Sequence, residues 1–139
     1  MTPSGVPDAR HNLITGGAGF IGSHLAERLL AQGEHVVVID DFSTGTQHNL
    51  ASVENHPKLT VIESNVIECK ELSQLVSDST HVFHLAAAVG VDLVVQSPIR
   101  TIETNLKATE AILDAAAPGQ TPLLLPSSSE VYGKSAKEG

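Results

Sequence analysis

The chain has 139 residues, 41% of them hydrophobic, and this length and composition fit one globular domain rather than a disordered segment. Its formal net charge of −8 argues against nucleic acid or an anionic membrane surface as a partner, because both select basic faces. Cys69 is the only cysteine, which excludes a disulfide within the chain, and the longest apolar stretch, residues 85–91, is too short to span a membrane. Residues 1–10 lack the apolar core of a signal peptide, so we expect a flexible tail and a cytoplasmic protein.

Short apolar runs alternate with helical patterns in the first half of the chain. Residues 12–15 predict a buried strand. A helix is predicted over residues 20–32, with Ile21, Leu25 and Leu29 on its core face at helical spacing, and Gly33 is typical of a helix C-terminus. The β-branched run at residues 36–39 is typical of a parallel strand buried on both faces, and residues 42–57 predict a polar connection with one helical turn.

The same alternation continues through the second half. We expect strands at residues 59–62, 82–85 and 123–125, a short helix at residues 71–76, and a long helix from about Pro98 to about Ala117. The predicted core stripe of the long helix consists of Ile102, Leu106, Thr109, Leu113 and Ala116. Alternating strands and helices favour right-handed crossovers and a parallel sheet. The sequence therefore predicts a doubly wound α/β fold (Rossmann fold) with strand order 3-2-1-4-5 and a ligand where that order reverses.

A glycine-rich turn joins the first strand to the first helix. Gly16, Gly19 and Gly22 are spaced G-x-x-G-x-x-G, which suits a turn with positive φ, a close approach of the backbone to a pyrophosphate, and tight packing of helix on strand. The amides of Phe20 and Ile21 open the helix and would face the phosphates. A purely structural turn is the alternative, but the order of strand, glycine turn, helix, second strand and acid favours a dinucleotide site.

The acid in this pattern is Asp40, which ends the second strand 18 positions after Gly22. A carboxylate there can accept hydrogen bonds from both ribose hydroxyls of NAD and would repel the 2′-phosphate of NADP. No Arg or Lys follows Asp40 nearby. The sequence therefore predicts NAD as the cofactor.

These segments together resemble the extended short-chain dehydrogenase/reductase family, in particular its NAD-dependent nucleotide-sugar epimerases and dehydratases of the UDP-glucose 4-epimerase type. The resemblance is carried by residues 15–25, 40–45, 84–89, 104–109 and 127–133. It implies that Asp41 joins Asp40 at the adenosine ribose and that Asn65 and Val66 lie beside the adenine, although relatives usually have Asp at position 65. It further implies cofactor contacts at the adenosine, the nicotinamide-side ribose and the active site for Ser43, Thr44, Gly45, Leu85, Ala86, Ala87 and Asn105. A satisfied buried amide is the alternative for Asn105.

Residues 127–133 read Ser-Ser-Ser-Glu-Val-Tyr-Gly and resemble the catalytic motif of the same family. The resemblance puts Ser128 at the position of the hydroxyl that hydrogen-bonds the sugar 4-oxygen during proton transfer. It aligns Ser129 and Glu130 with residues that assist elimination or decarboxylation in some relatives. UDP-sugar 4-epimerase activity is the main prediction, and nucleotide-sugar 4,6-dehydratase or UDP-glucuronate decarboxylase activity stays open beside it, as does a non-catalytic NAD-binding module.

The base of this family is a Tyr in a Tyr-x-x-x-Lys motif, which this chain does not contain. Tyr132 is its only tyrosine, and Ala136 stands where the Lys would be. We therefore expect residues 11–139 to be the incomplete NAD-binding domain of a longer enzyme, inactive alone and without its sugar-binding domain. Relatives commonly form homodimers through two helices per subunit, one of which matches the long helix. The 7 histidines are scattered, which predicts no metal site and favours solvated or strand-end side chains.

Overall fold

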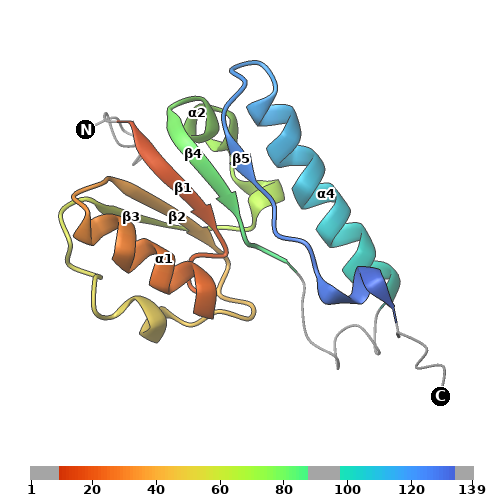
Figure 1. Cartoon of the computed structure of the whole chain (residues 1–139), viewed down its shortest axis with the longest axis horizontal. Helices are drawn as coiled ribbons and strands as arrows, with labels where there is room; N and C mark the ends of the chain where they lie inside the picture. Colours follow the sequence, from red (N-terminus) through yellow and green to blue (C-terminus); the bar gives the residue numbers. More distant parts are fainter. Residues whose placement is uncertain (1–9, 88–97, 134–139) are drawn as a thin grey trace.

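The protein contains one parallel sheet with the predicted strand order. The structure, a computed structural model, describes residues 10–87 and 98–133, with the side chains of residues 129 and 130 excepted. The sheet has five strands in the order β3-β2-β1-β4-β5 (Figure 1). They are β1 (His11–Thr15), β2 (Val36–Asp40), β3 (Leu59–Glu63), β4 (Ser79–His84) and β5 (Leu123–Leu124). Each neighbouring pair is parallel, so the doubly wound α/β architecture is confirmed.

Helices cover both faces of this sheet. Helix α1 (Phe20–Ala31) lies on one face, and α2 (Leu72–Ser77) and α4 (Pro98–Ala116) lie on the other (Figure 1). The predicted polar connection after β2 contains the short 3-10 helix η1 (Gln47–Leu50). Two further 3-10 helices are η2 (Val66–Glu68), which follows β3, and η3 (Ser129–Tyr132), which follows β5.

The core consists of two layers that are separated by the sheet. Along β1 and β2 successive side chains point to opposite faces. Leu13 and Val37 join the core cluster that contains residues of α2 and α4, whereas Ile14 and Val38 join the cluster that contains residues of α1. All four side chains are 0% exposed, which explains why the β-branched run of β2 has no polar alternation.

Helix α1 buries a different stripe from the predicted one. Leu25 and Leu29 pack partly against the core as predicted, but Ile21 is 69% exposed, so its core assignment is wrong. The reason is the contact between the helix and the glycine turn: a Cβ on Gly22 would lie 2.7 Å from the Cα of Gly17. This contact sets the rotation of the helix. Its fully buried residues are Gly22, Ser23, Ala26 and Leu30.

Helix α4 also presents a different face to the sheet. Ile102, Leu106 and Leu113 were predicted in the core, yet they are 58%, 66% and 49% exposed. The buried stripe is instead Thr101, Ala108, Ile112 and Ala116. Small side chains at two of these positions let the helix approach its neighbours closely, and α4 packs against α2 and η2. The prediction was therefore right only for Ala116 and in part for Thr109, which is half-buried.

Candidate functional site

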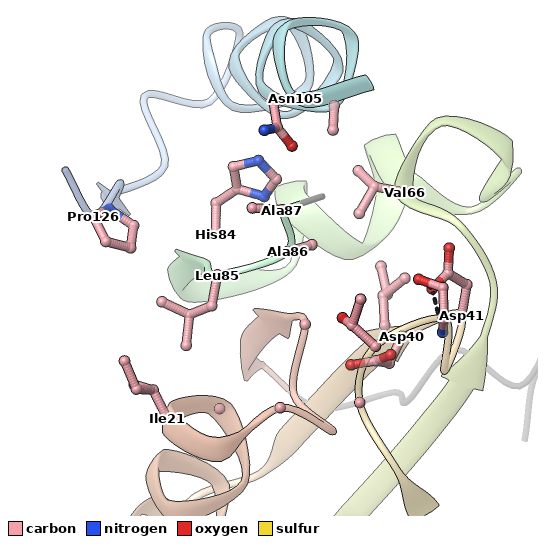
Figure 2. Close-up of a pocket in the computed structure, with 18 of the residues that line it drawn as sticks. Ile21, Asp40, Asp41, Val66, His84, Leu85, Ala86, Ala87, Asn105 and Pro126 are labelled. Carbon is pink, nitrogen blue, oxygen red and sulfur yellow. Dashed lines mark hydrogen bonds between the residues drawn. The ribbon is translucent and has the colours of Figure 1, made fainter. Parts of the chain in front are cut away.

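A cavity of about 740 Å³ lies at the carboxyl ends of the strands, where the strand order reverses between β1 and β4 (Figure 2). Its size falls within the range of small-molecule and cofactor sites, about 300–1,000 Å³. All sixteen positions predicted to contact the cofactor line this cavity. They are Gly16, Gly19, Phe20, Ile21, Gly22, Asp40, Asp41, Ser43, Thr44, Gly45, Asn65, Val66, Leu85, Ala86, Ala87 and Asn105. The fold therefore gathers into one cavity predicted cofactor positions that are up to 89 residues apart in the sequence.

The glycine turn forms one wall of the cavity. Gly16 has a φ of +71°, and its amide donates to the carbonyl of Ile39 at 2.8 Å, which ties the turn to the end of β2. Gly19 is the N-cap of α1 and makes no side-chain cap, and the first turn of the helix carries no acidic residue. Backbone amides at a helix N-terminus attract anions because they lack partners within the helix. This wall is thus suited to a pyrophosphate.

Asp40 lines the cavity and also makes hydrogen bonds within the protein. Its side chain is only 8% exposed, and its two oxygens accept hydrogen bonds from different backbone amides. One oxygen accepts from Ala18 in the glycine turn and the other from Phe42, each at 2.8 Å. Each oxygen keeps a further lone pair for a ligand hydroxyl. The carboxylate therefore holds the glycine turn against β2 in addition to lining the cavity.

Asp41 lies next to Asp40 at the rim of the cavity (Figure 2), and Asn65 lines the same cavity. Asp41 accepts from the amide and the hydroxyl of Ser43 at 3.0 and 2.6 Å, and from the Asn65 side-chain amide at 3.0 Å. Burial opposes ionisation of Asp41, but the hydrogen bonds from Ser43 and Asn65 outweigh it and lower its pKa. The Asn65 side-chain oxygen accepts from the amide of Ile67 and so caps η2. Asn65 therefore shapes the rim through protein contacts.

His84 is a cavity residue that the sequence pattern does not mark as a site residue. It lies at the end of β4, in agreement with the predicted strand-end position. It is only 3% exposed, however, and it lines the cavity below Asn105 (Figure 2). Its Nδ1 lies 2.7 Å from the Thr15 hydroxyl, and its Nε2 lies 3.5 Å from the Thr109 hydroxyl. The Thr15 hydroxyl oxygen also accepts from the amide of Ala86. His84 therefore connects β1 with α4 across the point where the strand order reverses.

Burial lowers the pKa of His84 below its usual value of about 6.5. As pH falls below about 6.5, the unfolded chain binds a proton at this position before the folded chain does. We therefore expect the free energy of unfolding to decrease with falling pH until the lowered pKa is reached. Replacing His84 with Asn keeps an acceptor near Thr15 and removes the titration, so the variant should show a shallower decrease. Urea unfolding of the unmodified chain and of His84→Asn at about pH 7.5 and about pH 5.5 measures the two decreases. Equal decreases in the two proteins would contradict a lowered pKa for His84.

The segment after β5 also lines the cavity, through residues 125–128. Ser128 is exposed and lines the cavity, as its predicted contact with a substrate requires. The side chains of Ser129 and Glu130 lie outside those that the structure describes, so their predicted roles stay predictions. Tyr132 is 89% exposed and is not among the lining residues. Other lining residues that the sequence did not indicate as site residues are Ile39, Ser64, Thr104, Ala108, Thr109, Leu125, Pro126 and Ser127.

Neither a metal centre nor a membrane span is found in the described part of the chain. Residues 10–87 and 98–133 contain no group of three or more His, Cys, Asp or Glu side chains that could hold a metal ion. Within the same ranges, no helix combines the length and the apolar character that crossing a bilayer requires.

Comparison with known sequences places most of the chain within one family model. The model described as GDP-mannose 4,6 dehydratase matches residues 13–139. The chain is 42% identical over 126 residues to UDP-N-acetyl-alpha-D-glucosaminuronate decarboxylase of Bacillus cytotoxicus, a match that covers 88% of this chain and 37% of the relative. It is 36% identical over 121 residues to UDP-glucuronic acid decarboxylase 1 of Arabidopsis thaliana, covering 87% and 27%. The chain thus spans well under half of either relative.

Solved structures resemble this one over nearly the whole chain. A UDP-N-acetylglucosamine 4-epimerase from Methanobrevibacter ruminantium superposes with a TM-score of 0.83 at 32% identity, covering 95% of this chain and 42% of the epimerase. The dTDP-glucose 4,6-dehydratase DesIV from Streptomyces venezuelae, solved with NAD bound, superposes with a TM-score of 0.82 at 31% identity. That match covers 89% of this chain and 41% of the dehydratase.

Proposed function

Because the chain belongs to the NAD-dependent nucleotide-sugar epimerase and dehydratase family of extended short-chain dehydrogenases/reductases, we propose that its cavity binds NAD and serves sugar oxidation in a longer enzyme. The observation that carries this proposal is the convergence of the glycine turn, Asp40 and Ser128 on one cavity where the strand order reverses. The NAD bound to the similar dehydratase supports the choice of cofactor.

Among the reactions of the family, we favour decarboxylation of a UDP-linked uronic acid over the simple 4-epimerisation that was the main prediction from the sequence. Both relatives reported above are UDP-uronate decarboxylases. The chain also has Glu130 within the motif at residues 127–133. The residue that aligns with Glu130 assists elimination or decarboxylation in some relatives. A UDP-sugar 4-epimerase is the second candidate, supported by the similar epimerase structure.

The proposed chemistry is transient oxidation at C4 of the sugar. When bound, NAD would accept the hydride from C4 and later return it. A ketone at C4 is β to the C6 carboxylate, so the C5–C6 bond can break with release of carbon dioxide while its electron pair forms a C4–C5 enolate. A proton then adds to C5, which restores the C4 ketone that the returning hydride reduces. Ser128 would donate a hydrogen bond to the 4-oxygen and stabilise the negative charge that develops there. The base that removes the proton from the 4-hydroxyl is assigned to a residue outside these 139.

The first test is the choice between the two dinucleotides. Titration calorimetry of the chain with NAD and NADP should show NAD binding at least about tenfold more tightly, because a 2′-phosphate would be brought close to Asp40 and Asp41. Equal affinity for both dinucleotides would contradict the assigned ribose site.

The second test separates the candidate reactions in a longer protein that includes this chain. Incubation with UDP-glucuronate and with UDP-N-acetylglucosaminuronate should release carbon dioxide from one of them and produce the corresponding pentose. UDP-glucose and UDP-N-acetylglucosamine should be left unchanged at C4. Conversion of the neutral sugars alone would establish the 4-epimerase alternative, and NAD binding without turnover of any of the four would establish a non-catalytic module.

A further inference from the structure

The middle of the glycine turn is held from outside the cavity. Ala18 is 0% exposed, and its carbonyl accepts two hydrogen bonds from the connection between β2 and β3. The Asn49 side-chain amide donates one at 2.8 Å, and the amide of Thr46 donates the other at 3.1 Å. Asn49 lies in η1 and is not among the residues that line the cavity.

The peptide group that follows Ala18 is held at both of its ends. Its carbonyl accepts from Asn49 and Thr46, and its amide, which belongs to Gly19, donates to the carbonyl of Gly16 at 3.2 Å. Gly19 is also the N-cap of α1. The orientation of this single peptide group therefore determines where the first amides of the helix point.

Asn49 is exposed, and the packing of its neighbours along the chain sets its position. The next residue, Leu50, is 2% exposed and belongs to the same core cluster as Ala18. On the other side of Thr46, Gly45 lies so close that a Cβ there would be 2.7 Å from the carbonyl carbon of Ala18. The segment from Gly45 to Leu50 thus packs directly against the glycine turn. This packing positions the two donors to the Ala18 carbonyl, the backbone amide of Thr46 and the side-chain amide of Asn49.

We propose that Asn49 is a positioning residue for the dinucleotide: it fixes the Ala18–Gly19 peptide group so that the glycine turn is already in its binding conformation before the ligand arrives. This inference rests on the proposed NAD site. If the turn samples other conformations, the apparent dissociation constant increases in inverse proportion to the fraction of competent molecules. Asn49 therefore contributes to cofactor affinity without contacting the cofactor.

The decisive variant is Asn49→Asp, which keeps the size of the side chain but replaces its amide donor with a carboxylate facing the Ala18 carbonyl. Gln47→Glu is the matched control, because Gln47 is exposed in the same 3-10 helix, does not line the cavity, and its replacement adds the same charge. We expect Asn49→Asp to weaken NAD binding by about threefold to tenfold and Gln47→Glu to change it by less than about twofold. Asn49→Ala, which removes the donor without adding charge, should show the same direction.

A second measurement uses the chain without ligand. Hydrogen exchange of peptides that cover the glycine turn should be faster in Asn49→Asp than in Gln47→Glu, while exchange in β2 and α4 stays unchanged. Unchanged exchange in the turn, or NAD affinity equal to that of the control, would overturn the inference. If the unmodified chain binds no NAD, the proposed function fails, whereas faster exchange confined to the turn would still support the positioning role of Asn49.

Discussion

Replacing Gly16 with alanine is expected to abolish measurable NAD binding and to destabilise the domain by about 2–5 kcal/mol. Two independent effects add at this position. Gly16 has a φ of +71°, which an L side chain rarely adopts, and a Cβ there would lie 2.7 Å from the amide nitrogen of Ala86. The colliding atoms are backbone atoms just beyond the end of β4, so they cannot move aside as a flexible side chain could. Any shift that relieves the contact opens the cavity between β1 and β4.

A matched substitution separates the two effects. Gly33 has a φ of +82°, but the nearest atom to its Cβ position is Lys58 Nζ at 3.9 Å. Gly33→Ala should therefore show only the conformational strain, about 1–2 kcal/mol, and should bind NAD like the unmodified chain. Urea unfolding measures the free energy of unfolding of each variant, and titration calorimetry measures its affinity for NAD. Equal destabilisation of the two variants, with NAD binding kept in Gly16→Ala, would show that the close approach to Ala86 has no role.

Replacing Asp40 with asparagine should also affect stability and cofactor binding together. The carboxylate accepts from the amides of Ala18 and Phe42, whereas the asparagine amide group can accept with one atom only and would bring an N–H group against the other donor. Because the side chain is 8% exposed, water compensates this loss poorly. We expect a loss of about 2–3 kcal/mol in the free energy of unfolding and NAD binding weaker by at least about tenfold.

The neighbouring acid provides the control for this substitution. Asp41 is exposed, and its carboxylate accepts hydrogen bonds from Ser43 and Asn65 at the rim. Asp41→Asn should lower the free energy of unfolding by less than about 1 kcal/mol, because exposed charge interactions contribute little. Chemical denaturation of both variants at neutral pH makes the comparison. If Asp40→Asn is as stable as Asp41→Asn, then Asp40 does not hold the glycine turn and its role is limited to the ligand.

Much of the site could be predicted from the sequence because its signals are local. The glycine spacing, the β-branched run before Asp40 and the alternation of strands and helices are each contained within a few tens of residues. In a parallel sheet with right-handed crossovers, the carboxyl ends of the strands lie at one edge. Residues at those ends therefore converge without any knowledge of side-chain packing. The glycine turn and Asp40, which the local pattern predicts, line the cavity, as do the positions that only the family resemblance implied.

The fold class, the strand order and the position of the cavity could thus be predicted from the amino-acid sequence, because hydrophobic period and turn residues act over short distances. Which stripe of α4 is buried depends instead on how the helix packs against the rest of the domain. That helix has two apolar stripes, and the smaller side chains of Ala108 and Ala116 allow a closer approach than Leu106 and Leu113 do. Tertiary packing also brings Asp40 into the hydrogen bond that holds the glycine turn, and it buries His84. Their partners Ala18 and Thr15 are 22 and 69 positions away, a separation over which no sequence pattern indicates which atoms meet.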